Sequence, residues 1–105
     1  TLIDGFSLDT ILHSLHPTPA VCGYPRKVAQ RKIAEIEPFS RGWYSGTLGI
    51  IHRGSVDFTV AIRSALAIKN DLYIWTGAGI VNNSVASEEW REINIKGKPF
   101  FDLAK

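Results

Sequence analysis

The apolar residues in the first third of the chain recur at helical spacing. Leu8, Ile11, Leu12 and Leu15 lie three or four residues apart and predict a short helix that Ser7 can cap. A second helix is expected over residues 25–37, because a proline is tolerated in a first turn and Pro38 disfavours continuation. The first third is therefore expected to be helical.

A further helix is predicted over the C-terminal stretch SEEWREINIKGKPFFDLA, residues 87–104. Ser84 or Ser87 is the expected cap, and two acidic residues follow in the first turn, as the helix dipole prefers. Gly97 and Pro99 are expected to weaken or kink the second half of this helix.

Between these helices, alternating apolar and polar residues predict an antiparallel β meander of three strands. The strands are YSGTLGIIH (44–52), VDFTVAIRSALAI (56–68) and LYIWTGAGIV (72–81), with turns at residues 53–55 and 70–71. Arg63 would stand in the middle strand on a face of small residues, which leaves room for a ligand or a packed helix. Together the elements predict an α+β fold.

Composition narrows the class of protein. At 105 residues and 45% hydrophobic, the chain suits one globular domain or part of one. A net charge of +2 without a basic stripe argues against nucleic acid, and no apolar run approaches the roughly 18 residues that span a membrane. The single Cys22 suits a reducing compartment, and the lack of Met suggests an excerpt of a longer protein that ends at its natural C-terminus.

The C-terminal helix offers candidate metal ligands. Glu89, Glu92 and Lys96 fall on one stripe, and two carboxylates one turn apart can share a hard cation such as Mg²⁺. The alternative is a solvated face with local ion pairs. Trp90 and Ile93 would then form the buried stripe.

A glycine-containing stretch and an arginine could bind an anion. In TGAGIV, residues 76–81, the glycines allow backbone N–H groups to approach a carboxylate or phosphate, although a tight turn or bulge explains them equally well. Arg63 could hold a carboxylate with two hydrogen bonds, or could pair with a structural carboxylate. With the carboxylate-bearing helix, this set suits a small polyanionic ligand bound with Mg²⁺.

The proline-rich segment HPTPAVCGYP, residues 16–25, is interpreted as a rigid wall between helices. Cys22 would need a nearby base to act as a nucleophile, so we expect it to be buried and inert. The three histidines show no metal-ligand spacing. Gly23 is expected to let the backbone approach closely.

Five ordered blocks of the chain closely resemble the C-terminal part of isochorismate synthases, within the chorismate-utilising enzyme family. They are LHPTPAVCGYPR, EPFSRGWYSG, VAIRSA, GAGIV and EEWREINIK. The resemblance implies an α/β fold with two stacked sheets, outer helices and an active site in the cleft. It also implies Mg²⁺-dependent isomerisation of chorismate to isochorismate. Residues 1–105 would be one segment, the C-terminal part of a chorismate-binding domain.

The resemblance also implies roles for individual residues. Glu92 resembles a direct Mg²⁺ ligand and Glu89 a second carboxylate, acting directly or through water. Arg63 and Tyr44 resemble contacts to the side-chain carboxylate of the substrate. The backbone of Gly77, Ala78 and Gly79 resembles amides that hold substrate oxygens, and Lys96 resembles a lysine near the metal and the ring carboxylate. Ala20 stands where the aminating relatives carry Thr, which favours an isomerase.

The resemblance places the family's general base and general acid upstream of this chain. The intact protein is therefore expected to be an isomerase and the chain alone to be inactive. The blocks favour an enzyme of the menaquinone pathway. The expected location is the cytoplasm, or the plastid stroma if the source is plant-like. The intact protein is expected to be a monomer. A salicylate synthase or another chorismate-utilising enzyme is the alternative, and a non-catalytic remnant or carboxylate-binding module is the rival from another class.

Overall fold

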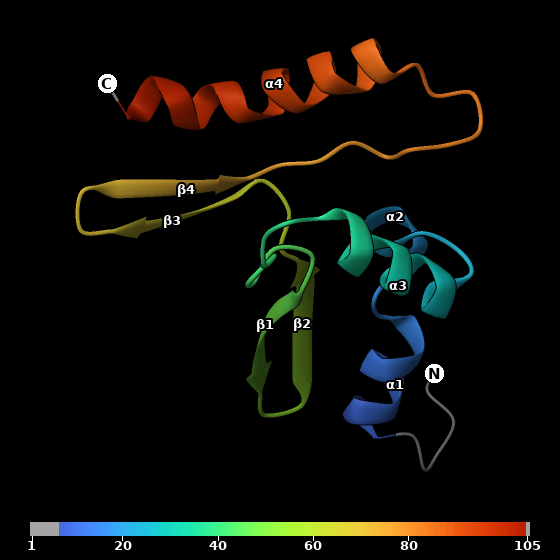
Figure 1. The fold of residues 1–105 in the computed structure, drawn as a ribbon. Coiled ribbons are helices and arrows are strands. Elements are labelled where there is room, and N and C mark those ends of the chain that lie inside the picture. The colour runs from blue at the N-terminus through green and yellow to red at the C-terminus, as the bar shows by residue number, and fades with distance from the viewer. Residues whose placement is uncertain (1–6, 105) are drawn as a thin grey trace. The chain divides into compact units, whose positions relative to one another are not determined.

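The computed structural model describes residues 7–104. The chain divides into two compact units, Thr1–Ser40 and Arg41–Lys105. The described part of the first unit is helical, and the second unit contains antiparallel strands followed by a long helix (Figure 1). This confirms the predicted α+β character.

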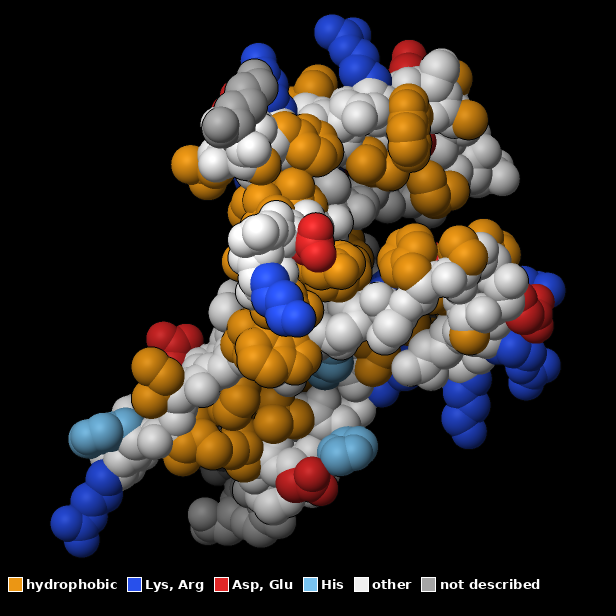
Figure 2. All heavy atoms as spheres, turned by 60° about the vertical axis from the view of Figure 1, so that its left-hand side comes forward, with side chains coloured by type: hydrophobic (Ala, Val, Ile, Leu, Met, Phe, Trp, Pro, Cys, Tyr) orange, Lys and Arg blue, Asp and Glu red, His pale blue; other side chains and the backbone are white. Residues whose placement is uncertain are grey.

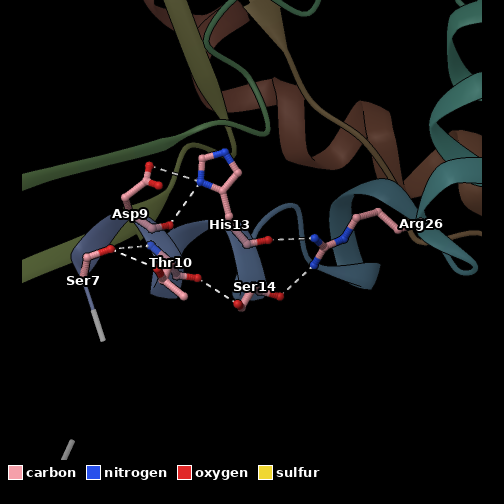
Figure 3. Close-up of polar contacts among 6 residues, drawn as sticks. All are labelled: Ser7, Asp9, Thr10, His13, Ser14 and Arg26. Carbon is pink, nitrogen blue, oxygen red and sulfur yellow. Dashed lines mark hydrogen bonds and ion pairs between the residues drawn. The ribbon is translucent and has the colours of Figure 1, made fainter. Parts of the chain in front are cut away.

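The first helix, α1 (Leu8–Leu15), begins as predicted. The Ser7 side chain accepts a hydrogen bond of 3.2 Å from the backbone N–H of Thr10, which satisfies one of the free donors at the helix start (Figure 3). At the other end, the Arg26 guanidinium donates to the carbonyl oxygens of His13 and Ser14, at 2.9 Å each. The last turn of α1 is therefore closed by a side chain from α3 (Arg26–Ile36).

The proline-rich segment contains a single helical turn, α2 (Pro19–Cys22), which the sequence reading did not predict. Cys22 is only 6% exposed, so its predicted burial is confirmed. Gly23 follows with φ +82°, and a Cβ there would lie 3.1 Å from the Cβ of Ala29 in α3. Glycine therefore satisfies both a left-handed backbone and a close approach between α2 and α3.

The second unit contains four strands rather than three, so the predicted meander is wrong. Strands β1 (Thr47–His52) and β2 (Ser55–Val60) form one antiparallel hairpin, and β3 (Ser64–Ile68) and β4 (Asp71–Trp75) form another (Figure 1). The first hairpin turns at residues 53–54, where Gly54 has φ +85°. The second turns at residues 69–70.

The expected middle strand breaks because Ala61 ends the first hairpin. The Ala61 N–H donates to the Gly46 carbonyl and the Ser45 N–H donates to the Ala61 carbonyl, each at 2.8 Å. Arg63 then adopts φ +47°, which turns the chain out of the strand direction before β3 begins. Alternation in the sequence continues through this point, although the strand does not.

The long helix α4 (Ala86–Leu103) runs through Gly97 and Pro99 as one element. Its cap is Val85 without a side-chain hydrogen bond, so the prediction of a serine cap is wrong. Ser84 instead accepts a 3.0 Å hydrogen bond from the N–H of Val81, within the preceding loop. Gly97 is buried against the Phe101 ring, where a Cβ would lie 2.9 Å from the nearest ring carbon. A residue that weakens an isolated helix therefore improves packing here.

The described residues bury little apolar surface. Cys22 and Ala61 are the buried hydrophobic residues among them, whereas large apolar side chains such as Ile50, at 73% exposed, and Trp43, at 79%, face outward. Figure 2 shows hydrophobic side chains spread over the visible surface. None of the helices formed by residues 7–104 has the length and apolar character needed to cross a bilayer.

Candidate functional site

The middle of α4 and the loop after β4 are joined by hydrogen bonds. The ammonium group of Lys96 donates to the carbonyl oxygen of Gly77 at 3.0 Å. One residue earlier in the loop, the hydroxyl of Thr76 lies 3.4 Å from the carbonyl oxygen of Ile93. The Thr76 methyl group also approaches Gly97, 3.6 Å from where a Cβ would stand. The stretch TGAGIV is thereby fixed beside the helix that carries the predicted metal ligands.

Tyr44 reaches the same loop from the turn that precedes β1. Its hydroxyl oxygen lies too close to leave room for a Cβ on residue 77, so the phenol sits directly against the Gly77 backbone. The Arg41 guanidinium lies 5.7 Å from the centre of the Tyr44 ring and donates to the Ser45 hydroxyl at 3.2 Å. The cation–π contact holds the Tyr44 ring, and the hydrogen bond anchors the Arg41 side chain that makes it.

Glu92 and Lys96 form an ion pair one turn apart on α4. Their side chains are half-exposed and one-quarter exposed, so the pair lies at the edge of the packed region. Glu89 lies one turn before Glu92 and is half-buried. Trp90 is 66% exposed, so the expected buried stripe of Trp90 and Ile93 is wrong for Trp90, whereas Ile93 is half-buried beside Thr76.

The backbone of Gly77, Ala78 and Gly79 offers hydrogen-bond donors. Within residues 7–104 the N–H groups of Ala78 and Gly79 do not donate to any other group, although Ala78 is half-buried. A Cβ at Gly79 would meet no atom within 4 Å, so the space beside this residue is open. Free amides beside open space are suited to binding an anionic oxygen.

Arg63 and Ala20 are predicted site residues for which the structure gives no contact with this group. Arg63 is not mid-strand, as predicted, but in the link between β2 and β3, where it is exposed with φ +47°. Ala20 is an exposed residue of α2, in the first unit. The structure therefore brings together Tyr44, Gly77, Glu92 and Lys96, from three separate segments of the second unit.

Sequence reasoning missed Arg41 and Thr76, which support this group without belonging to it. The spacing of Arg41 and Tyr44 within RGWY gave one usable signal, because an arginine three residues from a tyrosine can reach the ring face. Gly97 was a second usable signal, because glycine inside a helix often marks the close approach of another segment. Here that segment contains Thr76.

The arrangement supplies an ammonium group, a phenol and free backbone amides, together with the carboxylates of Glu89 and Glu92, of which Glu92 is paired with the ammonium group. Such a set can orient an anion while the carboxylates attract a cation. Within the described part of the chain, no group of three or more His, Cys, Asp or Glu side chains is placed to hold a metal ion. Glu89 and Glu92 could therefore provide only part of a metal site.

The chain matches a known family over nearly its whole length. The sequence profile of the family described as "Chorismate binding enzyme" matches residues 1–104. The chain is 47% identical over 96 residues to the chloroplastic isochorismate synthase of Catharanthus roseus, covering 90% of this chain and 17% of that protein.

Bacterial relatives match at similar levels. The chain is 45% identical over 93 residues to isochorismate synthase MenF of Haemophilus influenzae, covering 89% of this chain and 22% of that protein. It is 43% identical over 96 residues to the salicylate biosynthesis isochorismate synthase of Pseudomonas aeruginosa, covering 90% and 20%. The chain thus spans about a fifth of the length of these curated relatives.

Proposed function

Because this chain belongs to the chorismate-binding enzyme family, we propose that it is part of an isochorismate synthase, in which it binds substrate and metal. The observation that carries the proposal is the meeting of Tyr44, Gly77 and Lys96 beside Glu92. These residues come from separate segments, and the family resemblance assigns Tyr44, Gly77 and Lys96 to the substrate and Glu92 to its metal ion. The relatives named isochorismate synthase support the same reaction.

The substrate is a dicarboxylate, and the cluster suits one carboxylate at each side. The free amides of Ala78 and Gly79, with the Tyr44 phenol, would orient the side-chain carboxylate, and Arg63 would add a bidentate contact. Lys96 would lie near the ring carboxylate. Ala20 would present a small apolar side chain to the site, at the position where the aminating relatives carry threonine. This would favour an isomerase.

Glu92 and Glu89 would hold Mg²⁺. The oxygen donors fit this ion, because Mg²⁺ binds through one or two carboxylates and keeps several waters. The pair with Lys96 occupies one oxygen of Glu92 and leaves the second available. When bound, the ion would neutralise a substrate carboxylate. Further ligands would come from outside this chain, in agreement with the two carboxylates found here.

Isomerisation requires water to add at one ring carbon as hydroxide leaves another, which needs a general base and a general acid. We place both in the part of the enzyme that precedes this chain, together with the strands that complete two stacked sheets. On this proposal the chain alone cannot turn over chorismate. The menaquinone pathway remains the proposed setting, in the cytoplasm or, for a plant-like source, the plastid stroma, with the enzyme a monomer.

The test is an assay of the intact protein with chorismate and Mg²⁺. Coupling to an isochorismatase should reveal isochorismate formation that stops on addition of EDTA and returns with Mg²⁺. Accumulation of salicylate without a coupling enzyme would instead identify a salicylate synthase. The absence of any chorismate consumption, in a protein that is folded by circular dichroism, would contradict the proposal and favour a non-catalytic module. The 105-residue chain serves as the control and should show no turnover.

A further inference from the structure

Lys96 contacts backbone as well as a carboxylate, and the backbone contact suggests a second role for it. We propose that Lys96 is a positioning residue that, by holding the Gly77 carbonyl, aims the N–H of Ala78 at an anionic oxygen of the ligand. This rests on the proposed function for the identity of the ligand. It goes beyond the expectation that Lys96 lies near the ring carboxylate, because it assigns the lysine to the geometry of an amide donor.

The planarity of the peptide bond connects the two groups. The cis peptide bonds of the described residues precede Pro17 and Pro25, so the bond between Gly77 and Ala78 is trans. In a planar trans peptide, the carbonyl oxygen and the following N–H point in opposite directions. A lysine that holds the Gly77 oxygen on the α4 side therefore directs the Ala78 N–H away from α4.

The lysine is itself held in place. Its ammonium group pairs with Glu92, one turn earlier on the same helix, and its side chain is only 25% exposed. A charged donor to a carbonyl forms a stronger hydrogen bond than a neutral one. The Gly77 oxygen is therefore fixed by a donor with restricted freedom, on a helix rather than on a loop.

The opposite side of residue 77 is limited by Tyr44. Its hydroxyl oxygen lies where a Cβ would begin, so the Gly77 backbone is held between the phenol and the lysine. Glycine alone would allow the peptide plane many orientations. The two contacts reduce that freedom. Ala78 is half-buried, and its N–H has no hydrogen-bond partner within residues 7–104. An unpaired amide of fixed direction, one residue before the open space at Gly79, is suited to an anionic oxygen.

The test compares Lys96→Met, Lys96→Arg and a matched control, Lys98→Met, in the intact protein. Lys98 is exposed on the same helix and lies outside the cluster. Crystals grown without chorismate should show the Gly77–Ala78 peptide rotated in Lys96→Met and unchanged in Lys98→Met. This readout does not depend on catalysis, so it decides the positioning role even if chorismate is not the substrate.

Kinetics supply the second measurement. Loss of one aimed donor should lower kcat/KM for chorismate about 100-fold in Lys96→Met. Lys96→Arg keeps a charged donor and should stay within about tenfold of wild type, and Lys98→Met within about twofold. A Gly77 carbonyl that keeps its direction in Lys96→Met would overturn the proposal, whatever the rate. A rotated peptide with an unchanged kcat/KM would also overturn it, because the amide would then have no role in binding.

Discussion

The hydroxyl oxygen of Tyr44 occupies the space in which a side chain on residue 77 would begin. The turn before β1 and the loop after β4 therefore meet at a point where any side chain on residue 77 would have to displace the Tyr44 ring. The same loop is tied to α4 through Lys96. Three segments that are distant in sequence converge on one peptide unit, and this convergence gives the proposed site its geometry.

We expect Gly77→Ala to destabilise the intact protein by about 1–3 kcal/mol, the usual cost of overpacking. The added methyl group would collide with the Tyr44 hydroxyl oxygen. Thermal denaturation should show a lower Tm, and the chorismate KM should rise because the amides move.

The matched control for stability is Gly79→Ala, in which the new Cβ meets no atom within 4 Å and the Tm should hardly change. Adding Tyr44→Phe to Gly77→Ala should restore part of the lost stability, because it removes the colliding oxygen. Equal losses of Tm in both alanine variants would argue against the contact.

Glu92→Gln should raise the Mg²⁺ concentration needed for half-maximal activity at least tenfold. The substitution keeps the size of the side chain but removes the charge that attracts the cation. Titration of Mg²⁺ in the isochorismate assay measures this effect directly. Glu88→Gln is the control, because Glu88 is exposed in the first turn of the same helix. An unchanged Mg²⁺ requirement in Glu92→Gln would remove this residue from the metal site.

Arg63→Gly should have opposite effects on stability and binding. Arg63 adopts a left-handed backbone, φ +47°, which costs residues other than glycine about 1 kcal/mol. The glycine variant should therefore be no less stable, although it should bind chorismate at least tenfold more weakly if the guanidinium holds a carboxylate. Calorimetric titration and Tm together measure both effects.

A control for this backbone effect exists in the same unit. Lys69 has φ +54° in the turn between β3 and β4, so Lys69→Gly changes the same kind of residue in the same conformation. Its Tm should respond as that of Arg63→Gly does, while chorismate affinity stays at the wild-type value. Equal affinities in both variants would show that Arg63 does not contact the substrate.

Arg26→Ala should loosen the last turn of α1. Two carbonyl groups, of His13 and Ser14, would lose their donor, at a cost of about 1 kcal/mol because the site is partly solvated. Hydrogen exchange of the α1 amides should accelerate about fivefold, whereas Lys27→Ala, an exposed neighbour, should leave it unchanged. Equal exchange rates in the two variants would show that Arg26 does not stabilise the helix end.

Local chemistry made parts of the fold predictable. Ser7 caps α1 through its own hydroxyl, and the apolar residues at helical spacing follow it directly, so both signals are local in the sequence. The turn at Gly54 was also predictable from local sequence, because glycine readily adopts the positive φ that the turn requires. The end of β2 was not, because it depends on hydrogen bonds between Ala61 and the distant Ser45–Gly46 turn. A pattern of alternation does not contain that information.

The site shows the same division. The stripe of Glu92 and Lys96 on α4 followed from spacing, and the ion pair agrees with it. The contact of Lys96 with Gly77 could not be predicted, because it depends on how α4 lies beside the loop after β4. Trp90 was placed in a buried stripe because it is apolar, yet it is exposed. The described residues alone do not provide enough surface to cover it.

The split of the strands into two hairpins has a kinetic consequence. Each strand pairs with its immediate neighbour in sequence, from His52 with Ser55 outward to Thr47 with Val60, so both hairpins form through local contacts. Hairpins of this kind close in about 1–10 μs. We therefore expect both hairpins to form early, and any pairing of their open edges with strands outside this chain to be slower, because it must close longer loops.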